Sequence, residues 1–510
     1  MLLADVAATS AALAATRSRL AKRTLLVDLL RRTAPAEVPV VARYLSGELR
    51  QRRTGLGWRS LRDLPAPAAD PTLDVLAVDA TFERMSALAG PGSAGARSAL
   101  AADLFGAATA DEQRLLAGLV AGELRQGALD ALLLDAVAEA SGADPAAVRR
   151  AAMLAGATEP VAQAALAAPD PESATAALTG FGLTVGRPVR PMLAASAPDV
   201  ATAVAGFEGR AAVVDAKLDG IRVQVHREGD DVRVFTRSLD DITARVPEVV
   251  TAVRALPVTS VVLDGEALAL DADGRPRPFQ ETAARSATRD AEIAATTTLT
   301  PFFFDVLHRD GTDLLDAPLT DRLAVLDAIA PAHTVQRVVT SDPEVAQEAF
   351  AGWVAAGQEG VVVKDAAAPY EAGRRGGAWV KVKPRHTLDL VVLAVERGSG
   401  RRAGLLSNIH LGARDGDGGF VMLGKTFKGM TDEVLAWQTA RFRDLETADD
   451  GWTVTLRPEQ VVEIAFDGVQ RSTRYPGGLA LRFARVLRYR EDKTAAEADT
   501  VQAVRALLPR

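Results

Sequence analysis

The stretch AVVDAKLDGIRVQV, residues 212–225, decides how the middle of the chain folds. Its first part, AVVDA, is typical of a β-strand, the Asp-Gly pair is a turn signal, and IRVQV alternates apolar and polar residues like a second strand. The pattern predicts two strands joined by a tight turn. Lys217 lies at the end of the first strand, beside the turn, where a charged side chain in an α+β sheet tends to line a cleft.

Charged residues hold similar positions in several later strands. Glu266 follows a second Asp-Gly pair in an apolar strand, and Glu359 comes directly before a strand of valines. Lys381 and Lys383 lie two residues apart, which puts both on one face of their strand. The segments concerned are LDGEALAL (263–270), FFFDV (302–306), EGVVVK (359–364) and WVKVKP (379–384).

Together these residues have the chemistry of a nucleotide-binding site. Two cations on one strand face attract the phosphates of a nucleoside triphosphate, and a carboxylate such as Glu359 can hold Mg²⁺. We expect the same two cations to lie beside Lys217 and to favour its uncharged, nucleophilic form. Only eight of the 59 basic residues are lysines, which suggests that lysine is kept where a guanidinium cannot do the same chemistry.

The chain of 510 residues is long enough for about three domains. Residues 1–185 are rich in Ala and Leu and repeat apolar positions at helical steps, which predicts an all-α domain. Prolines and glycines in GLTVGRPVRPMLAAS, residues 182–196, mark a linker. Strands mixed with helices then predict an α+β domain over 186–386, and short strands with Gly-rich turns predict a small β-barrel over 387–510.

The net charge of −7 argues against a nucleic-acid partner when taken alone, but the basic residues are clustered. Local clustering matters more for phosphate binding than the sum over the chain. A single cluster is as typical of a solvated face as of a binding site, whereas three in one acidic chain favour a polyanionic partner. The clusters are RQRRTGLGWRSLR (50–62), AGRRGGAWVKVKPRHTL (372–388) and residues 471–493.

Several kinds of site and location are disfavoured. The chain has no cysteine, which excludes disulfides and a zinc site built on thiolates. No apolar run approaches the roughly 18 residues of a membrane span, and the N-terminus lacks the basic-then-apolar order of a signal peptide, so we expect a cytoplasmic protein without a membrane partner. GFVMLGKT (419–426) matches the P-loop pattern, but its variable positions read as a strand and no helix follows directly.

KLDGIR (217–222) resembles the nucleotidyl-lysine motif of ATP-dependent DNA ligases and mRNA capping enzymes. K-x-D-G alone is only moderately specific, but TRSLDDIT (236–243), the four strand segments above and RYREDK (488–493) follow in the family's order at plausible spacings. The helical third resembles the DNA-binding domain of three-domain DNA ligases at ELRQGALD (123–130) and RPVRPMLA (187–194). The resemblance covers essentially the whole chain and is nearest to the auxiliary ATP-dependent ligases of bacteria.

The resemblance implies a multidomain fold: an all-α N-terminal DNA-binding domain, an α+β nucleotidyltransferase (adenylation) domain and a C-terminal β-barrel of the OB-fold type. It implies that Lys217 attacks the α-phosphorus of ATP, expels pyrophosphate and becomes adenylated. The AMP then passes to the 5′-phosphate of a nick, and the 3′-hydroxyl attacks and releases AMP. The implied partners are ATP with Mg²⁺ and nicked double-stranded DNA, and we expect a monomer that works at the nucleoid.

The resemblance also implies roles in nucleotide binding. Phe304 stacks on adenine, while Glu266 and Arg222 hold the ribose. Lys381 and Lys383 contact the α-phosphate. These roles would place base, sugar and phosphate along one cleft beside the nucleophile.

Further roles concern the metal, the nick and the leaving group. The resemblance implies that Glu359 and Asp219 support the metal and the later steps, and that Arg237 faces the nick phosphate. Many relatives have Glu two residues before the lysine, where it meets the adenine amino group; this chain has the shorter Asp215, which leaves adenine specificity less secure. The residues that resemble the motif orienting pyrophosphate are Arg490, Asp492 and Lys493.

Four other functions share part of this pattern. A capping guanylyltransferase or an RNA ligase has the lysine motif but does not need the helical region in front of it, and label transferred from GTP would favour capping. An NAD-dependent ligase normally carries a four-cysteine zinc site, for which the chain lacks cysteine. A non-catalytic nick-binding protein is disfavoured because every expected ionisable residue is present; a Lys217-dependent adenylate would distinguish the enzyme from it.

Overall fold

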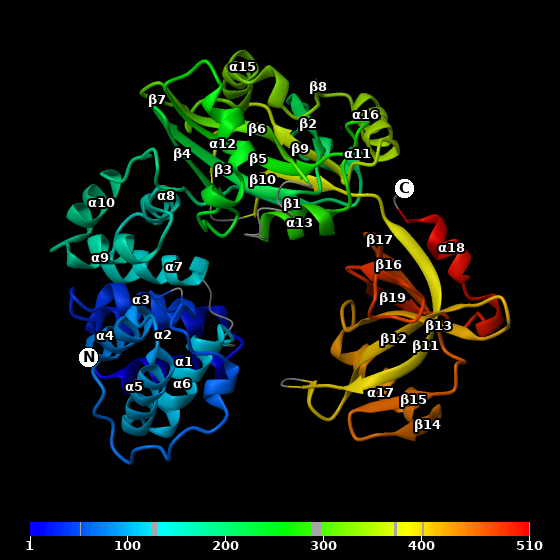
Figure 1. The fold of residues 1–510 in the computed structure, drawn as a ribbon, viewed down its shortest axis with the longest axis horizontal. Helices are drawn as coiled ribbons and strands as arrows, with labels where there is room; N and C mark the ends of the chain where they lie inside the picture. Colours follow the sequence, from blue (N-terminus) through cyan, green and yellow to red (C-terminus); the bar gives the residue numbers. More distant parts are fainter. Residues whose placement is uncertain are drawn as a thin grey trace.

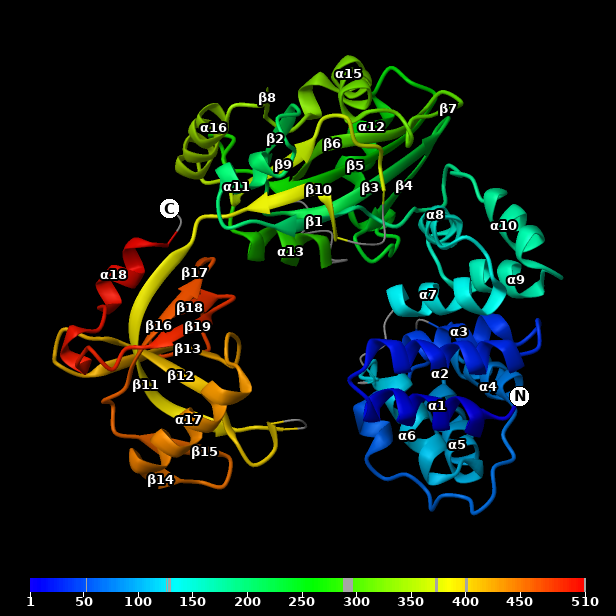
Figure 2. The same cartoon turned by 180° about the vertical axis from the view of Figure 1, so that it is seen from behind.

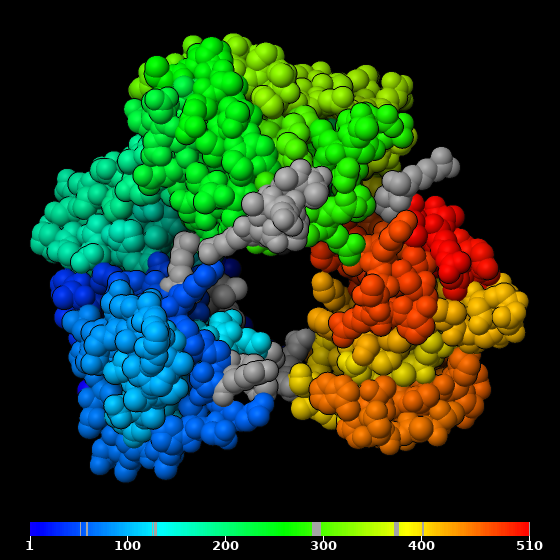
Figure 3. All heavy atoms as spheres, viewed as in Figure 1, coloured from blue at the N-terminus to red at the C-terminus, as the bar shows by residue number. Residues whose placement is uncertain are grey.

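The structure, a computed structural model, describes residues 1–51, 53–124, 126, 130–287, 297–371, 375–399 and 402–508. The described residues form a helical part, a central part with two sheets and a C-terminal part built mainly of strands (Figures 1 and 2). Each part has its own buried apolar core. The helical and C-terminal parts lie beside the central part, and an opening remains between them (Figure 3).

The helical part contains no β-strand among its described residues. Its helices are α1 (Leu3–Ala15), α2 (Arg19–Arg32), α3 (Val38–Ser46), the 3-10 helix η1 (Trp58–Leu61), α4 (Val75–Ala87), α5 (Ser93–Ala107), α6 (Ala110–Ala121), α7 (Asp130–Ser141), α8 (Pro145–Ala155), α9 (Glu159–Ala167) and α10 (Pro171–Thr179). Thr109 and Glu112 form a capping box at the start of α6, and Asp144 caps α8, with Pro at its first position. Local sequence signals therefore set these helix ends.

The central part contains two five-stranded sheets, with strand orders β1-β10-β9-β2-β8 and β4-β3-β5-β6-β7. Their strands are β1 (Leu193–Ser196), β2 (Ala212–Lys217), β3 (Ile221–Glu228), β4 (Asp231–Thr236), β5 (Ser260–Ala269), β6 (Leu299–Arg309), β7 (Thr312–Asp313), β8 (Arg337–Thr340), β9 (Gly360–Asp365) and β10 (Arg375–Val382). This mixture of strands and intervening helices confirms the α+β class.

The stretch interpreted as two strands joined by a tight turn does form two strands, but they do not pair with each other. β2 pairs with β8 and β9, whereas β3 pairs with β4 and β5. Asp219 and Gly220 therefore carry the chain from one sheet to the other, next to Lys217. A Cβ on Gly220 would overlap the Ala267 carbonyl oxygen, so glycine is needed for this close passage. The two predicted strands are confirmed, whereas their pairing depends on which strands the rest of the domain supplies.

Helices cover the two sheets and bury their apolar faces. The helices of the central part are α11 (Val200–Ala205), η2 (Thr243–Arg245), α12 (Pro247–Arg254), α13 (Phe279–Ala287), α15 (Leu319–Ile329), η3 (Pro331–His333) and α16 (Pro343–Ala355). Helices α11 and α16 share a core with the first sheet, and α12 and α15 with the second. A further cluster joins α8 of the helical part to both sheets, since Met153 and Leu154 share it with Trp379 of the first sheet and with Val262 and Leu307 of the second.

The C-terminal part contains a seven-stranded sheet and the two-stranded sheet β17–β18, and helices α17 and α18 pack into its core. Its elements are β11 (His386–Arg397), β12 (Leu406–Arg414), β13 (Phe420–Thr426), α17 (Asp432–Asp444), β14 (Glu446–Asp449), β15 (Thr453–Leu456), β16 (Val461–Phe466), β17 (Gly468–Arg471), β18 (Leu479–Arg482), β19 (Arg485–Tyr489), η5 (Ala495–Glu497) and α18 (Val501–Ala506). The long strand β11 pairs with β16 along its first half and with β12 and β15 along its second. The P-loop look-alike lies in β13, which confirms that it is a strand.

Candidate active site

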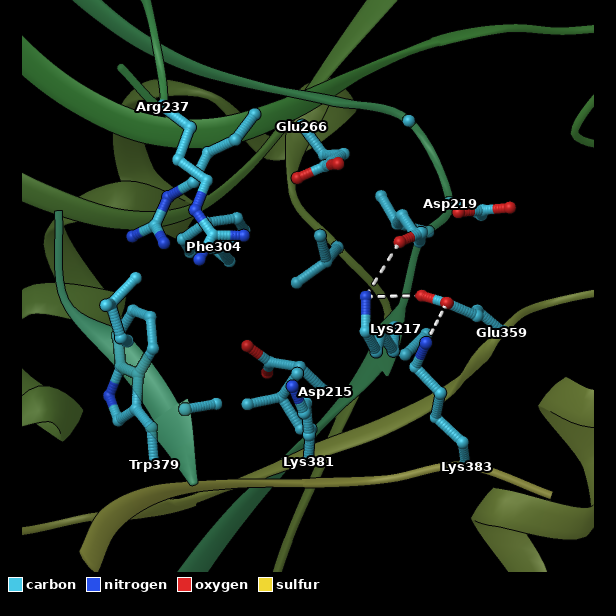
Figure 4. A pocket seen from close by; sticks show the side chains of 18 of the residues that line it. Asp215, Lys217, Asp219, Arg237, Glu266, Phe304, Glu359, Trp379, Lys381 and Lys383 are labelled. Carbon is cyan, nitrogen blue, oxygen red and sulfur yellow. Dashed lines mark hydrogen bonds and ion pairs between the residues drawn. The ribbon is translucent and has the colours of Figure 1, made fainter. Parts of the chain in front are cut away.

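A cavity of about 490 Å³ lies where the two sheets of the central part meet. Strands β2, β9 and β10 contribute one wall and β3, β5 and β6 another. Figure 4 shows Lys217, Glu359 and Lys383 at one end of it and Phe304 and Trp379 at the other. The predicted residues that line the cavity are Asp215, Lys217, Asp219, Arg222, Arg237, Glu266, Phe304, Glu359, Lys381 and Lys383.

Lys217 ends β2, and its amine points toward Glu359 (Figure 4). Lys217 Nζ lies 2.5 Å from Glu359 Oε2 and donates to the Leu218 carbonyl at 3.4 Å. The Glu359 N–H donates to the Lys217 carbonyl at 2.9 Å, so backbone pairing brings the two side chains together. Gly360 is required beside them because a Cβ there would overlap the Val382 carbonyl oxygen. The Lys217 side chain is 23% exposed, so a ligand in the cavity can reach the amine.

The nearest charged partner of this amine is a carboxylate, which corrects the expectation that cations surround Lys217. Glu359 also pairs with Lys383, so one carboxylate lies between two amines. Burial alone would raise the pKa of Glu359, but Lys217 and Lys383 outweigh it and lower that pKa. Strand alternation placed Lys381 and Lys383 on one face correctly, yet it could not show what the rest of the domain places opposite them.

At the other end of the cavity, two aromatic rings surround a buried lysine. Phe304 and Trp379 meet edge to face with ring centroids 5.8 Å apart. Lys364 Nζ lies 4.7 and 4.3 Å from these two centroids. The same amine pairs with Asp215 Oδ2 at 2.5 Å and donates to the Phe304 carbonyl at 3.2 Å. Burial raises the pKa of Asp215, although Lys364 opposes that shift.

Lys364 and Trp379 were not among the predicted site residues, although both stand in segments that the sequence singled out. Trp379 precedes Lys381 and Lys383 at the same two-residue spacing, so alternation could have placed all three on one face of β10. Lys364 follows a run of valines, and such a position signals burial rather than ligand binding. Its role in pairing with Asp215 therefore had no sequence signal.

Arg222 is held by protein groups on several sides. Its guanidinium donates to both carboxylate oxygens of Asp264, at 3.0 and 2.7 Å, and to the Met192 carbonyl at 2.7 Å. The Tyr370 hydroxyl donates to the same carboxylate at 2.7 Å and accepts from the Met192 N–H at 3.0 Å. In this arrangement Arg222 supports the cavity wall beside Phe304, and three of its five N–H donors are used by protein groups.

The side chains of Glu266 and Arg237 face the cavity and make no hydrogen bond or ion pair to any residue that the structure describes. Glu266 projects from β5, and burial raises its pKa to about 7, although Lys217 and Arg222 act in the opposite direction. Arg237 directly follows β4 and is exposed. Both side chains therefore keep their polar atoms available for a bound molecule.

The C-terminal part reaches the cavity through the hairpin β17–β18. Arg482, the last residue of β18, donates to both carboxylate oxygens of Asp219, at 2.6 and 3.3 Å. Asp467 accepts from Lys383 at 3.1 Å, and Phe483 lines the cavity. The sequence placed Arg482 only in a basic cluster, because no local pattern shows which face of a barrel meets another domain.

Comparisons with known proteins agree with this geometry. Residues 191–383 match the family model "ATP dependent DNA ligase domain", and residues 402–493 match "ATP dependent DNA ligase C terminal region". A "Probable DNA ligase" of Beutenbergia cavernae is 73% identical over 509 residues, which cover 99% of both chains. The chain belongs to the ATP-dependent DNA ligase family. The ligase is also 65% identical to a "Probable DNA ligase" of Kineococcus radiotolerans, over 99% of this chain and 100% of that one.

A solved structure named "Pmar-Lig_PreS3" has the same fold. It covers 95% of the ligase and 99% of its own chain with a TM-score of 0.62 and 19% identity, a similarity that concerns the fold alone. Membership in the family makes the chain an enzyme that seals nicks in duplex DNA, with ATP as co-substrate and a divalent metal, Mg²⁺, as cofactor. None of the ligase's described helices is both long and apolar enough to cross a membrane.

Three predicted residues of the ligase do not line the cavity. Arg490 pairs with Asp492 at 2.6 Å and with Asp389 at 3.0 Å, and Lys493 pairs with Asp389 at 2.6 Å. The structure thus brings Arg490, Asp492 and Lys493 together with one another but not with Lys217.

The basic clusters predicted to bind a polyanion are described only in part. In the first cluster of the ligase, Arg50 pairs with Asp79 and Glu83, whereas Arg53 is exposed. Other residues of these clusters and of ELRQGALD lie outside the described residues: Arg52, residues 372–374, Arg125 and residues 127–129.

Proposed function

We propose that Lys217 is the nucleophile that takes AMP from ATP in this ligase. The neutral amine attacks the α-phosphorus, a phosphorus–nitrogen bond forms, and the bond to pyrophosphate breaks. AMP then passes to the 5′-phosphate of a nick, and the 3′-hydroxyl attacks that phosphate and releases AMP. One observation carries this proposal: the amine of Lys217 projects into a cavity with cations at its own end and an aromatic pair at the other.

Position in the cavity supports a role for its neighbours in nucleotide binding. We propose that the adenine base lies against Phe304 and Trp379, with the Asp215–Lys364 pair below it. Glu266, whose carboxylate has no partner among the described residues, is proposed to accept a hydrogen bond from the ribose. Lys381 of β10 and Lys383, directly after that strand, are proposed to meet the α-phosphate, because both project from the face beside the nucleophile.

Other residues are proposed to act around this core. Arg222 is proposed to support the ribose site by stabilising the cavity wall through its bonds to Asp264 and the Met192 carbonyl. The exposed guanidinium of Arg237 suits the 5′-phosphate at the nick, a group that Arg binds through paired N–H donors, and Asp219 borders the same region. Arg490 and Lys493 are proposed to orient pyrophosphate after the C-terminal part changes its position, since they lie away from the cavity in this structure.

Mg²⁺ fits the carboxylate end of the cavity. Among the described residues, no three His, Cys, Asp or Glu side chains gather so that they could hold a metal by themselves. Mg²⁺ is usually bound by one or two carboxylates together with water and substrate phosphates, so a full protein cage is not needed. We propose that Glu359 and Asp219 supply these carboxylates, exchanging their present partners Lys217, Lys383 and Arg482 for the ion. When bound, Mg²⁺ neutralises charge on the phosphates.

We propose that residues 1–185, 186–386 and 387–510 are the DNA-binding, adenylation and OB-fold domains. The last helix of the first ends at Thr179, and only three residues separate β10 from β11. A barrel of the OB type is supported by β11, which two sets of partners share along its length. Duplex DNA would pass through the opening in Figure 3. One chain then carries all surfaces, which favours a monomer, and its substrate places the work at the nucleoid in the cytoplasm.

The experiment that tests the nucleophile uses ATP labelled in its α-phosphate. Wild-type protein and two variants, Lys217→Arg and Lys425→Arg, are incubated with the label and Mg²⁺ and then denatured. Lys425 is a suitable control because it pairs with Glu396 within the C-terminal part and does not line the cavity. We expect an acid-labile adenylate on wild type and Lys425→Arg and none on Lys217→Arg.

The same samples separate the alternatives. Lys217→Arg should still bind nicked DNA, since the candidate DNA surfaces are unchanged. An adenylate on Lys217→Arg would assign the nucleophile to another residue. Label accepted from GTP instead of ATP would point to capping chemistry, and sealing of RNA but not DNA nicks would point to an RNA ligase.

A further inference from the structure

Arg490 and Lys493 meet on a single carboxylate, that of Asp389. Asp389 Oδ2 lies 3.0 Å from Arg490 Nη1 and 2.6 Å from Lys493 Nζ. The two cations come from the loop after β19, whereas Asp389 stands near the start of β11, directly after the connection from the central part. One side chain at the domain junction therefore sets the separation of two cations that lie a hundred residues further along the chain.

The backbone of Asp389 is itself fixed. Its N–H donates to Asp499 Oδ2 at 2.7 Å, and its carbonyl accepts from the Asp499 N–H at 2.8 Å. This reciprocal pair ties β11 to the chain that follows Lys493. The carboxylate of Asp389 is only 12% exposed, so solvent competes little for its two partners.

Three carboxylates lie near Arg490, and it donates hydrogen bonds to two of them. Glu463 Oε2 is only within ion-pair distance, 4.0 Å from Nη1, and accepts from Arg488 Nε at 2.7 Å. Exposure distinguishes the two hydrogen-bonded partners, Asp389 and Asp492. Asp492 accepts from Arg490 Nε at 2.8 Å and from Nη2 at 2.6 Å, which occupies the outer edge of the guanidinium. An incoming phosphate that binds Arg490 through paired N–H donors must displace one of the two carboxylates. Asp492 is 63% exposed, so its release into water costs little free energy. Asp389 is shielded from water and bound to both cations.

We propose that Asp389 is a positioning residue that holds Arg490 and Lys493 as one preformed unit for pyrophosphate, and that Asp492 is the carboxylate that yields to it. This inference rests on the proposed function, in which these two cations orient the leaving group. It adds a residue at the domain junction that acts on pyrophosphate only through the two cations. The electrostatics agree: with Asp492 turned away, the cations Arg488, Arg490 and Lys493 face the two carboxylates of Asp389 and Glu463, so a net positive charge remains.

The reverse of adenylation, in which pyrophosphate reacts with the lysyl-adenylate, tests the contact between pyrophosphate and the two cations directly. A pyrophosphate oxygen attacks the phosphorus of the lysyl-adenylate, the phosphorus–nitrogen bond breaks, the nitrogen takes up a proton, and ATP is released. Purified enzyme–adenylate labelled in AMP is titrated with pyrophosphate, and the concentration that gives half the maximal rate of label release is measured. Adenylation by ATP and sealing of a pre-adenylated nick are measured on the same proteins.

Asp389→Asn keeps the shape of the side chain and removes its charge. We expect the half-maximal pyrophosphate concentration to rise about tenfold and adenylation to slow by a similar factor, the size expected when a charge-assisted contact is lost. Sealing of a pre-adenylated nick, which involves no pyrophosphate, should change by less than about twofold. Asp389→Glu, which keeps the charge, should recover part of the pyrophosphate response.

Glu491→Gln is the matched control. Glu491 lies between Arg490 and Asp492, is exposed, and has no hydrogen bond or ion pair to a described residue, so its change removes one negative charge from the same loop without touching the unit. It should leave all three measurements near wild type. An unchanged pyrophosphate response in Asp389→Asn, or equal slowing of all three reactions that Asp389→Glu does not relieve, overturns the proposal. Wild type that forms no adenylate refutes the proposed function instead.

Discussion

Among the cavity side chains, Glu266 is one whose pKa is clearly changed by burial. It has no hydrogen-bond or ion-pair partner among the described residues, and burial raises its pKa to about 7, because a low-polarity environment disfavours the charged carboxylate. In an unfolded chain a Glu titrates at about 4.3. The folded protein therefore binds this proton more tightly than the unfolded chain does. The stability that this protonated group contributes is lost as the pH rises from about 4.3 to about 7.

Glu266→Gln removes the titration while keeping the shape of the side chain. Relative to this variant, wild type should lose about 2–3 kcal/mol of unfolding free energy between about pH 4.3 and about pH 7, and nothing more above it. Urea unfolding of both proteins across this range gives the difference, in which the other titrating groups cancel. A difference that stays constant with pH would mean that Glu266 has the same pKa in the folded and unfolded states.

Much of the site at this scale could be predicted from single positions. Lys217 at the end of its strand, Glu359 before the valines, and Lys381 with Lys383 on one face follow from a two-residue alternation that needs no knowledge of the fold. The partner of each side chain could not be predicted in the same way. The ion pair between Asp215 and Lys364 joins strands that are distant in sequence, and only the sheet order brings them together.

Among the elements, the hairpin β17–β18 has the clearest functional consequence. It places Arg482 on Asp219 and Phe483 in the cavity, while Arg490 and Lys493 face elsewhere. Two faces of the C-terminal part thus carry two different sets of residues. Under the role proposed for Arg490 and Lys493, pyrophosphate needs them only in the first step, so the arrangement seen here suits the later steps, in which the nick is bound.

Arg482→Ala tests this assignment of the hairpin. Sealing of a pre-adenylated nick should slow about tenfold, since Asp219 loses a bidentate charged partner, while adenylation by ATP should change by less than about twofold. Single-turnover rates for the two reactions give the comparison. Arg457→Ala, which removes an exposed ion pair with Glu459 in the same part of the molecule, should affect neither. Slower adenylation than sealing would assign the hairpin to the first step.

Strands and helices themselves were largely predictable, whereas their pairing was not. The alternation in IRVQV marks β3, and Asp144 with Pro145 marks the start of α8, because both signals are local. That β2 and β3 enter different sheets depends on β8 and β9, which come more than a hundred residues later. A turn signal such as Asp219-Gly220 shows where the chain reverses but not which strands then meet.

At the scale of the whole molecule, the helical part is joined to the nucleotide cavity by a shared apolar core. Met153 and Leu154 of α8 pack with Met192 and Trp379, and Trp379 lines the cavity. No periodicity in the sequence could show this contact, since each segment only signals that it is buried somewhere. Such contact surfaces determine how the domains are placed relative to one another, and this placement is the feature that is hardest to predict from the sequence.

Arg190 stabilises the same junction between the helical and central parts through polar contacts. Its guanidinium pairs with Asp130 and donates to Thr158 Oγ1 at 2.7 Å, and its N–H donates to the Met153 carbonyl at 2.9 Å. The side chain is only 15% exposed, so these bonds are shielded from water. They connect the linker before β1 to the starts of α7 and α9, and so they fix how the helical part stands against the central part.

Arg190→Met should loosen this junction while leaving the cavity intact. The concentration of nicked DNA that gives half-maximal sealing should rise about tenfold, because the two surfaces proposed to bind one duplex are no longer held in a fixed relative position before binding. Adenylation by ATP should stay near wild type, and the slope of DNA affinity against salt should not change, since no phosphate contact is removed. Arg150→Met, which breaks an exposed pair with Asp316, should behave like wild type. Equal losses in adenylation and sealing by Arg190→Met would show that the junction supports the cavity rather than the grip on DNA.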